Sequence, residues 1–211
     1  MHEENPTSDY IPGTRRSDSR AERTLDLEAQ ENSGESLTER EVLRAADTLA
    51  GYLRQQRAHY YPLGQSLGPR TKAFLARFFD PSLLGLVKIV RLAGERVPNP
   101  PFFEIAKTKG FRNLPDLTHQ SPVTFLDVIV FNEKHSERGL FHGLVHATQV
   151  QLLGVERFGE LLVRGSLRTK SYMMIPLKAH AFSLDCQFAE HRERGFSVET
   201  EVTRWLEQGR Y

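Results

Sequence analysis

Two histidines stand four residues apart in the segment HGLVH, at positions 142 and 146. Residues i and i+4 of a helix lie on the same face, so both imidazoles can point at one ion. Imidazole nitrogens bind zinc at about 2.0–2.1 Å, and they also suit iron and copper. The spacing of His142 and His146 therefore predicts part of a metal site, with zinc as the expected divalent metal and iron or copper as alternatives.

Gly143 follows the first histidine directly. Inside a helix, glycine costs about 0.5–1 kcal/mol relative to alanine, so its presence indicates that space is needed at this position. Two explanations remain open. The space could admit a ligand beside the metal, or it could allow a close contact between the helix and a neighbouring element.

The histidine pair needs a helix to align it, and the surrounding sequence predicts one. Ser136 followed by Glu137 is a helix-start signal, and Gly154 stops the helix after Leu153. Residues 123–131, rich in β-branched and aromatic side chains, predict a strand just before this helix. The histidines are therefore expected on a helix that follows a strand.

The remainder of the C-terminal half is expected to be helical. A short helix should carry Phe158, and Pro176, which suits a first helical turn, should open a long helix that Gly195 ends. A last short helix is expected around Trp205. These helices would surround the histidine helix.

The N-terminal half predicts fewer and shorter elements. Thr38 and Glu41 have the spacing of a capping box, and apolar residues at helical intervals extend that helix to about residue 57. A short helix over 70–79 and a strand over 86–92 follow, and the prolines within 98–101 predict a loop. The fold class is α+β, mostly helical, with a small sheet preceding the histidine helix.

Residues 1–37 differ from the rest in composition. They combine many charges with few large apolar side chains, so they bury too little surface to offset their ordering entropy. We expect a flexible tail over residues 1–37 and a single domain over 38–211.

Composition limits the function classes. Lysine and arginine total 28 against 27 for aspartate and glutamate, so no strongly basic surface indicates nucleic-acid binding. The single cysteine, Cys186, rules out an intramolecular disulfide and a zinc site of several cysteines. No apolar run is long enough for a membrane span, and the first residues lack a secretory signal pattern. A soluble, cytoplasmic protein is the expectation.

The order of landmarks around the histidine helix resembles that of the compact gluzincin-type zincin metallopeptidases. The segments are VTFLDVIVFNE, LFHGLVHATQVQLLG, RFGELL and IPLKAHAF, within residues 123–190, about a third of the chain. The family's wording is closer to H-E-x-x-H-x-x-Q-x-x-x-x-G, followed by P-x-E-x-E-A-[FY]. The landmarks that agree in order are Gln149, Gly154, Pro176, Ala181 and Phe182. The resemblance implies a zincin-like fold, a bound metal and hydrolysis.

The sequence departs from that family at the catalytic positions. Gly143 stands where the family has its glutamate base. A positioned general base typically raises the reaction rate by about 10²–10⁴-fold, and this chain lacks it at that position. Lys178 and His180 stand where it has two glutamates, one of which supplies the third metal ligand. Ordinary peptidase activity is therefore not expected.

Only one of Lys178 and His180 can face the metal, because positions two apart on a helix differ by about 200°. If His180 faces it, three histidines and an open position remain, and such a site lowers the pKa of bound water to about 7. If Lys178 faces it, the ammonium repels the cation and the scaffold holds no metal. We expect His180, since imidazole is a competent ligand and lysine is not.

Other side chains have weaker claims on the site. Tyr172 precedes the last long helix and could donate a hydrogen bond to a developing oxyanion, although core packing also explains it. Three glutamates could replace the missing base, and two residues share a helix face with His180. For all of these, solvent-exposed or capping roles are the simpler explanation: Glu133, Glu137, Glu160, Gln187 and His191. Cys186 is expected to be a small buried apolar residue.

Two functional hypotheses follow. The first is a metal-dependent enzyme, either a hydrolase or an oxidoreductase, with His142, His146 and His180 as ligands and a small molecule or peptide in the cleft beside the histidine helix. The second is a catalytically inactive scaffold, kept for binding a partner or small molecule. A bound stoichiometric metal favours the first hypothesis, and Lys178 pointing into the cleft favours the second.

Overall fold

The structure, a computed structural model, describes residues 37–169 and 171–211, and residues 37–211 group into one compact unit. The predicted tail lies outside the described residues except for Leu37. Within the described residues, no helix is long and apolar enough to cross a membrane.

A four-stranded sheet forms the centre of the unit, in the order β1-β2-β4-β3. β2 (Lys88–Arg91) runs parallel to β4 (Val128–Phe131), whereas β1 (Gln65–Ser66) and β3 (Val123–Phe125) pair antiparallel with their neighbours. All four residues of β4 are buried, as expected for a strand covered on both faces. β3 forms one edge of the sheet.

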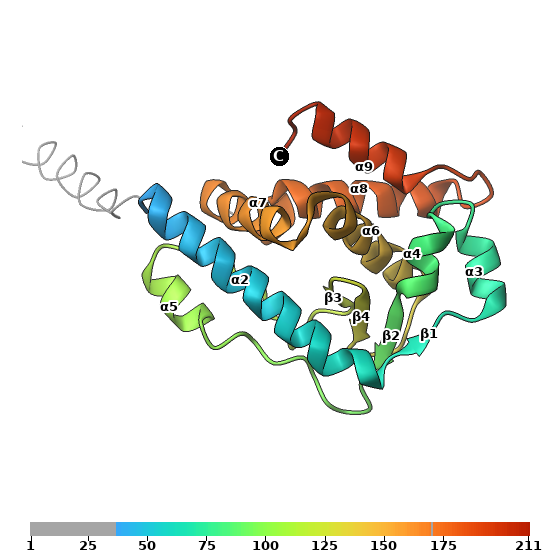
Figure 1. Cartoon of the computed structure of the whole chain (residues 1–211), viewed down its shortest axis with the longest axis horizontal. Helices are drawn as coiled ribbons and strands as arrows, with labels where there is room; N and C mark the ends of the chain where they lie inside the picture. Colours follow the sequence, from blue (N-terminus) through green and yellow to red (C-terminus); the bar gives the residue numbers. More distant parts are fainter. Residues whose placement is uncertain (1–36, 170) are drawn as a thin grey trace, which may run out of the picture. The chain divides into compact units, whose positions relative to one another are not determined.

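The unit has five longer helices (Figure 1): α2 (Glu39–Tyr60), α6 (Glu137–Leu153), α7 (Val155–Arg168), α8 (Pro176–Glu190) and α9 (Val198–Glu207). Of these, α2 and α6 pack against the sheet. α2 packs along α7, and α6 packs against both α8 and α9. The shorter elements are η1 (Tyr61–Leu63), α3 (Pro69–Leu75), α4 (Pro81–Leu86), α5 (Phe103–Thr108) and η2 (Tyr172–Met174). The fold class, α+β and mostly helical with a small sheet before the histidine helix, is confirmed.

The two faces of β4 belong to different hydrophobic clusters. Successive side chains of a strand point to opposite faces, so Val128 and Val130 join the cluster beside α2. Ile129 and Phe131 join the cluster beside α6, which includes Phe141 stacked on another ring of that cluster. The central strand therefore fixes α6, and with it both histidines, against one face of the sheet.

The predicted limits of the histidine helix are confirmed. The Ser136 hydroxyl accepts a hydrogen bond from the Gly139 amide at 3.0 Å and caps the start of α6. Gly154 ends the helix with a φ of 76°, a conformation that favours glycine. The capping box at Thr38 and Glu41 is also present at the start of α2.

The prediction of one strand over residues 123–131 was wrong, because the chain turns back between β3 and β4. Leu126 adopts a φ of 57° at this turn, although non-glycine residues rarely do so. The Asp127 carboxylate accepts two hydrogen bonds from Arg57 of α2, at 2.7 and 2.8 Å. The ion pair between Arg57 and Asp127 thus stabilises a turn that the β-branched residues on either side of it do not indicate.

Other predicted limits also need correction. The last long helix ends at Glu190 rather than at Gly195. A Cβ atom at position 195 would lie 2.9 Å from the carbonyl oxygen of Arg77, so this glycine permits a close approach instead of capping a helix. The helix expected over 70–79 ends at Leu75, and the strand expected over 86–92 covers only 88–91.

Candidate functional site

His142 and His146 lie on the same face of α6, as their spacing predicts. Their rings are perpendicular, with centroids 4.8 Å apart, and both border a large cleft. His146 is buried, and His142 is partly exposed to the cleft. The helix therefore aligns both imidazoles at one place.

A buried amide fixes the tautomer of His146. The Gln149 side chain donates from Nε2 to the backbone carbonyl oxygen of Leu177, at 3.1 Å, and this oxygen can only accept. The Gln149 Oε1 atom must then face His146 Nδ1, at 2.8 Å, so that Nδ1 carries the proton and donates. The lone pair of His146 therefore lies on Nε2, which points toward α8.

Lys178 lies where this lone pair points. Its Nζ atom is 3.3 Å from His146 Nε2, a distance at which the ammonium donates a hydrogen bond to the imidazole. The same ammonium lies 5.1 Å from the centre of the Tyr172 ring, within the range of a cation–π contact. Tyr172, predicted as an oxyanion donor, thus borders the cleft next to a cation.

His180 lies on another side of α8. Its ring stacks on Trp205 of α9, with centroids 4.6 Å apart and an angle of 3° between the planes. Its Nδ1 atom is buried without a hydrogen-bond partner among the described residues. We expected His180 to share a metal with His142 and His146. The structure instead places Lys178 beside this pair.

These residues, as arranged, do not fit a divalent metal. Within the described part of the chain, no group of three or more His, Cys, Asp or Glu side chains could hold an ion. The Nε2 lone pair of His146, which a metal would need, accepts from Lys178 instead, and an ammonium repels a cation. The donor set therefore consists of two imidazoles and one unsuitable amine.

Burial sets the charge state of the histidine pair. Burial, followed by the nearby charges of Lys178 and Arg138, lowers the pKa of His142 to about 4. The pKa of His146 lies well below its usual value, again through burial first and Lys178 second. Both imidazoles are neutral at pH 7, so the positive charge at this point of the cleft resides on Lys178.

A buried carboxylate completes this region. Asp185, only 4 % exposed, accepts a hydrogen bond from Arg138 Nε at 2.8 Å. Its other oxygen lies 3.9 Å from Nδ1 of His142. Neither Arg138 nor Asp185 was predicted as part of the site, although Asp185 stands seven residues, or two helical turns, after Lys178. That spacing is the signal that could have found it.

Gly143 allows α6 to approach the sheet. A Cβ atom at this position would lie 2.7 Å from Cγ2 and 3.0 Å from Cδ1 of Ile129, and 3.2 Å from the hydroxyl oxygen of Thr124. That hydroxyl also donates to the Gly143 carbonyl, at 3.3 Å. Of the two explanations that the sequence left open, a close contact with a neighbouring element is the one that this geometry supports.

The three glutamates that could replace a missing base are all engaged in ion pairs. Glu133 pairs with Arg96, Glu137 with Arg192, and Glu160 with Arg157 and Arg164. None of them borders the cleft. Gln187, His191 and Cys186 also lie outside the lining of the cleft. Cys186 is half-buried, and its sulfur lies 3.6 Å from Nη2 of Arg138.

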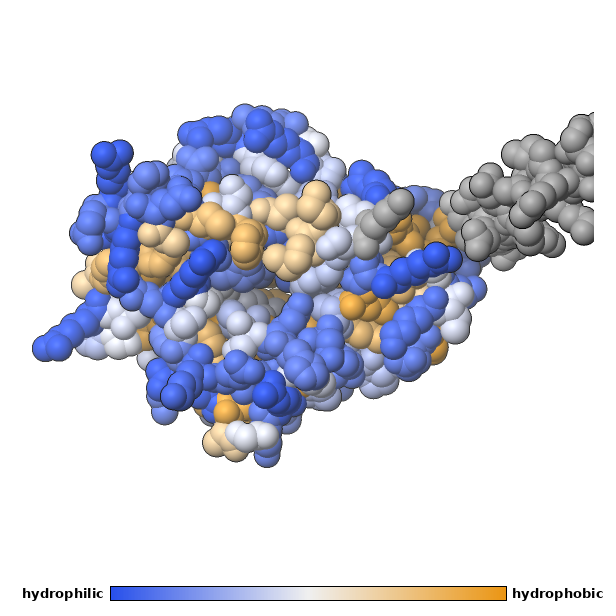
Figure 2. Space-filling model, turned by 180° about the vertical axis from the view of Figure 1, so that it is seen from behind, coloured by the Kyte–Doolittle hydropathy of each residue, from blue (hydrophilic) through white to orange (hydrophobic). Residues whose placement is uncertain are grey.

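The cleft itself has a volume of about 750 Å³ and is bordered by α2, α5, β3, α6, α7 and α8. Its walls consist mainly of apolar and aromatic side chains, among them Tyr52, Phe103, Phe125 and Phe158. Figure 2 shows hydrophobic side chains along a hollow on the face opposite to that of Figure 1. The sequence did not predict α5 or its contribution to this wall.

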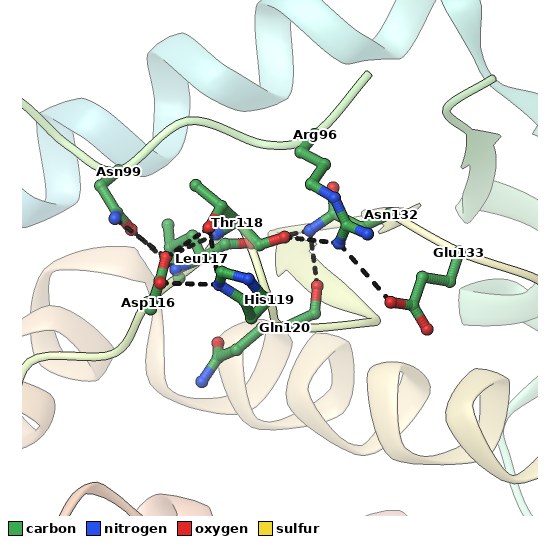
Figure 3. Close-up of polar contacts among 9 residues, drawn as sticks. All are labelled: Arg96, Asn99, Asp116, Leu117, Thr118, His119, Gln120, Asn132 and Glu133. Atoms are coloured by element: carbon green, nitrogen blue, oxygen red, sulfur yellow. Dashed lines mark hydrogen bonds and ion pairs between the residues drawn. The ribbon is translucent and has the colours of Figure 1, made fainter. Parts of the chain in front are cut away.

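Polar contacts hold the segments on either side of α5 (Figure 3). Asn99 and Asp116 are joined at 3.0 Å, and the Asn132 side chain bonds to three backbone groups of the adjoining segments, at 2.6–2.7 Å. The Thr118 hydroxyl donates to Asp116, and Nδ1 of His119 lies near both that hydroxyl and the Asp116 carboxylate. Because both groups meet the same ring nitrogen, they form no relay through the imidazole. We interpret this network as structural.

No family model matches the chain, and comparison with curated proteins and with solved structures gives no significant match. The resemblance to zincins therefore stays a prediction, and the geometry around Lys178 is what bears on function.

The contact at Gly143 leads to a stability prediction. Gly143→Ala should lower the free energy of unfolding by about 1–3 kcal/mol, because the added methyl group overlaps Ile129. Gly51→Ala in α2 is the matched control, since nothing lies within 4 Å of its Cβ position. That change should stabilise the protein by about 0.5–1 kcal/mol. Urea denaturation of both variants measures the difference, and a gain at position 143 would contradict the close contact.

The network beside α5 leads to a second prediction. Asn132→Ala should cost about 1–3 kcal/mol of unfolding free energy, because it leaves the amide of the fully buried Val97 without an acceptor. Glu133→Ala, at the adjacent exposed position, should change it by less than about 1 kcal/mol. Equal effects in thermal or urea unfolding would show that the Asn132 contacts are not stabilising.

The buried imidazoles predict a loss of stability in acid. The pKa of His142 and of His180 is lowered to about 4, whereas an unfolded chain titrates near 6.5. The unfolded state therefore binds more protons between these values, and the free energy of unfolding falls as pH drops from about 6.5 to 4. His180→Phe, which can keep the stack on Trp205, should make this fall less steep. An unchanged slope in urea titrations from pH 7 to 4.5 would contradict the assignment.

Proposed function

We propose that this protein is a zincin-like scaffold that holds no resident metal, does not hydrolyse peptides, and binds a ligand in its cleft. The position of Lys178 Nζ, 3.3 Å from His146 Nε2, carries the proposal. This ammonium takes the lone pair that a metal would require.

Two independent features support the loss of peptidase chemistry. Gly143 supplies no general base, and its Cβ position is filled by Ile129, so a larger side chain does not fit without a shift of the core. The three nearby glutamates are engaged in ion pairs outside the cleft. The residues that border the cleft therefore include no group placed as the family's base.

The size and lining of the cleft support a binding role. Ligand pockets usually measure about 300–1,000 Å³ and combine apolar walls with a few polar groups that fix orientation. The cleft of about 750 Å³ falls in this range, and Lys178, His142 and Asp185 are among its polar groups near the histidine helix. A partner or small molecule would be held mainly by the apolar walls.

The alternative, a metal-dependent enzyme with His142, His146 and His180 as ligands, requires two rearrangements. Lys178 would have to leave His146, and His180 would have to leave its stack on Trp205. The first of these is simple to test by substitution.

Replacing the lysine with the family's residue tests the proposal. Lys178→Glu would place a carboxylate beside two imidazoles, a ligand set that zinc favours. We expect the native protein to bind no stoichiometric zinc, and Lys178→Glu to bind about one zinc per chain, on the order of 100-fold more tightly than Lys178→Leu. Equilibrium dialysis followed by elemental analysis measures both quantities.

Lys178→Leu is the control because it removes the charge without adding a ligand. His146→Ala in the Lys178→Glu background should abolish the gained zinc. If the native protein instead carries about one metal per chain and loses it in the His142→Ala variant, the metal-free scaffold is refuted and the enzyme hypothesis gains support.

A further inference from the structure

The cleft contains a cation that no carboxylate neutralises among the described residues. Of the charged side chains that border it, Arg138 pairs with Asp185 at 2.8 Å and Lys109 pairs with Glu41 at 3.5 Å, whereas Arg44 lies at an exposed position of α2 and is hydrated. For Lys178, the contacts within the described chain are the neutral His146 and the face of Tyr172. An ammonium at the wall of a cleft without a carboxylate partner attracts an anion.

The rest of the cleft wall is mainly apolar. Leu49 and Tyr52 of α2, Phe103 of α5, and Phe158 and Leu162 of α7 border the same cleft. A multiply charged or sugar-rich ligand would leave its polar groups unpaired against such walls, at a considerable desolvation cost. The walls therefore favour a long apolar body.

From these two observations we propose that the cleft binds a single-chain amphiphile with a carboxylate head, such as a fatty acid. The head lies at Lys178, and the chain extends along the apolar walls. This inference rests on the proposed metal-free scaffold and names the ligand class of the same cleft.

The charges at the head position match a monoanion. An ammonium has three hydrogens, and one of them is directed to His146 Nε2, which leaves two for a carboxylate. The imidazole of His142 beside it is neutral at pH 7 and adds no charge. One net positive charge thus meets one net negative charge, and the salt bridge is sheltered by the rings of Tyr172 and His146.

The test uses dodecanoate and dodecan-1-ol, which share an apolar chain and differ in the charge of the head. Isothermal titration calorimetry of the full chain with both, below their aggregation concentrations, should show dodecanoate binding about 10–100-fold more tightly. Decanoate, two methylenes shorter, should bind up to about 15-fold more weakly than dodecanoate. The difference between acid and alcohol measures the contribution of the charged head. The difference between dodecanoate and decanoate measures the contribution of the apolar chain.

Two variants locate the ligand. Lys178→Met removes the charge and keeps a long apolar side chain, so it should abolish the preference for acid over alcohol. Ala45→Trp places a large ring at the apolar wall on α2 and should weaken both ligands equally. Lys134→Met, at an exposed position outside the cleft, is the control and should change neither affinity. Melting curves verify that each variant is folded.

Three outcomes would overturn the inference. Equal binding of acid and alcohol by the native protein would remove Lys178 as the head site. Dodecanoate binding that Ala45→Trp leaves unchanged would place the ligand elsewhere. Tighter binding of an apolar tripeptide with a free C-terminal carboxylate than of dodecanoate would make the occupant a peptide. None of these results affects the zinc experiment, so the scaffold proposal stands or falls separately.

Discussion

The orientation of one buried amide determines the chemistry of the cleft. Gln149 is fully buried between α6 and α8, and the Leu177 carbonyl that it bonds can only accept a hydrogen bond. This fixes which end of the amide faces His146, which ring nitrogen carries the proton, and which nitrogen is left to accept from Lys178. The same bond ties the start of α8 to α6, so the position of Lys178 depends on it as well.

The packing of α6 on the sheet also affects the chemistry of the cleft. Gly143 lets the helix approach Ile129 closely, and this contact fills the space in which the resembling peptidases hold their base. The charge of Lys178 and the small volume available at Gly143 thus both support the proposed absence of metal-assisted hydrolysis. The cleft remains, because its walls belong to α2, α5 and α7 and do not require a metal.

The sequence predicted the elements whose signals are local. Ser136 and Gly154 mark the ends of α6 because a cap and a left-handed glycine act within a few residues. It failed at the turn around Leu126, which depends on Arg57, some seventy residues earlier in the chain.

The candidate site shows the same division. The spacing of His142 and His146 correctly predicted that they share a face. The helical geometry showed that Lys178 and His180 cannot both face them, but it could not decide between the two. The stack of His180 on Trp205 brings together residues from two helices, and no pattern within either helix encodes it. The chemistry of the side chains alone favoured the imidazole of His180 as the neighbour of the histidine pair. Tertiary packing places the ammonium of Lys178 in that position instead.

The wall formed by α5 gives the cleft a distinct mechanical character. Asn99 bonds both to the Asp116 side chain and to the Leu117 amide, so residues 100–115 leave and rejoin the body of the protein at nearly one point, in the manner of an Ω-loop. Between these ends, α5 is only six residues long and has Ile105 exposed to 66 %. Between its ends the segment is held by the buried rings of Phe103 and Phe111 and by the bond from Asn113 to the Thr169 carbonyl, so these few contacts decide whether it opens while the sheet and α6 stay folded. An opening of this kind would expose the cleft at the cost of a local free energy, without unfolding the rest of the domain.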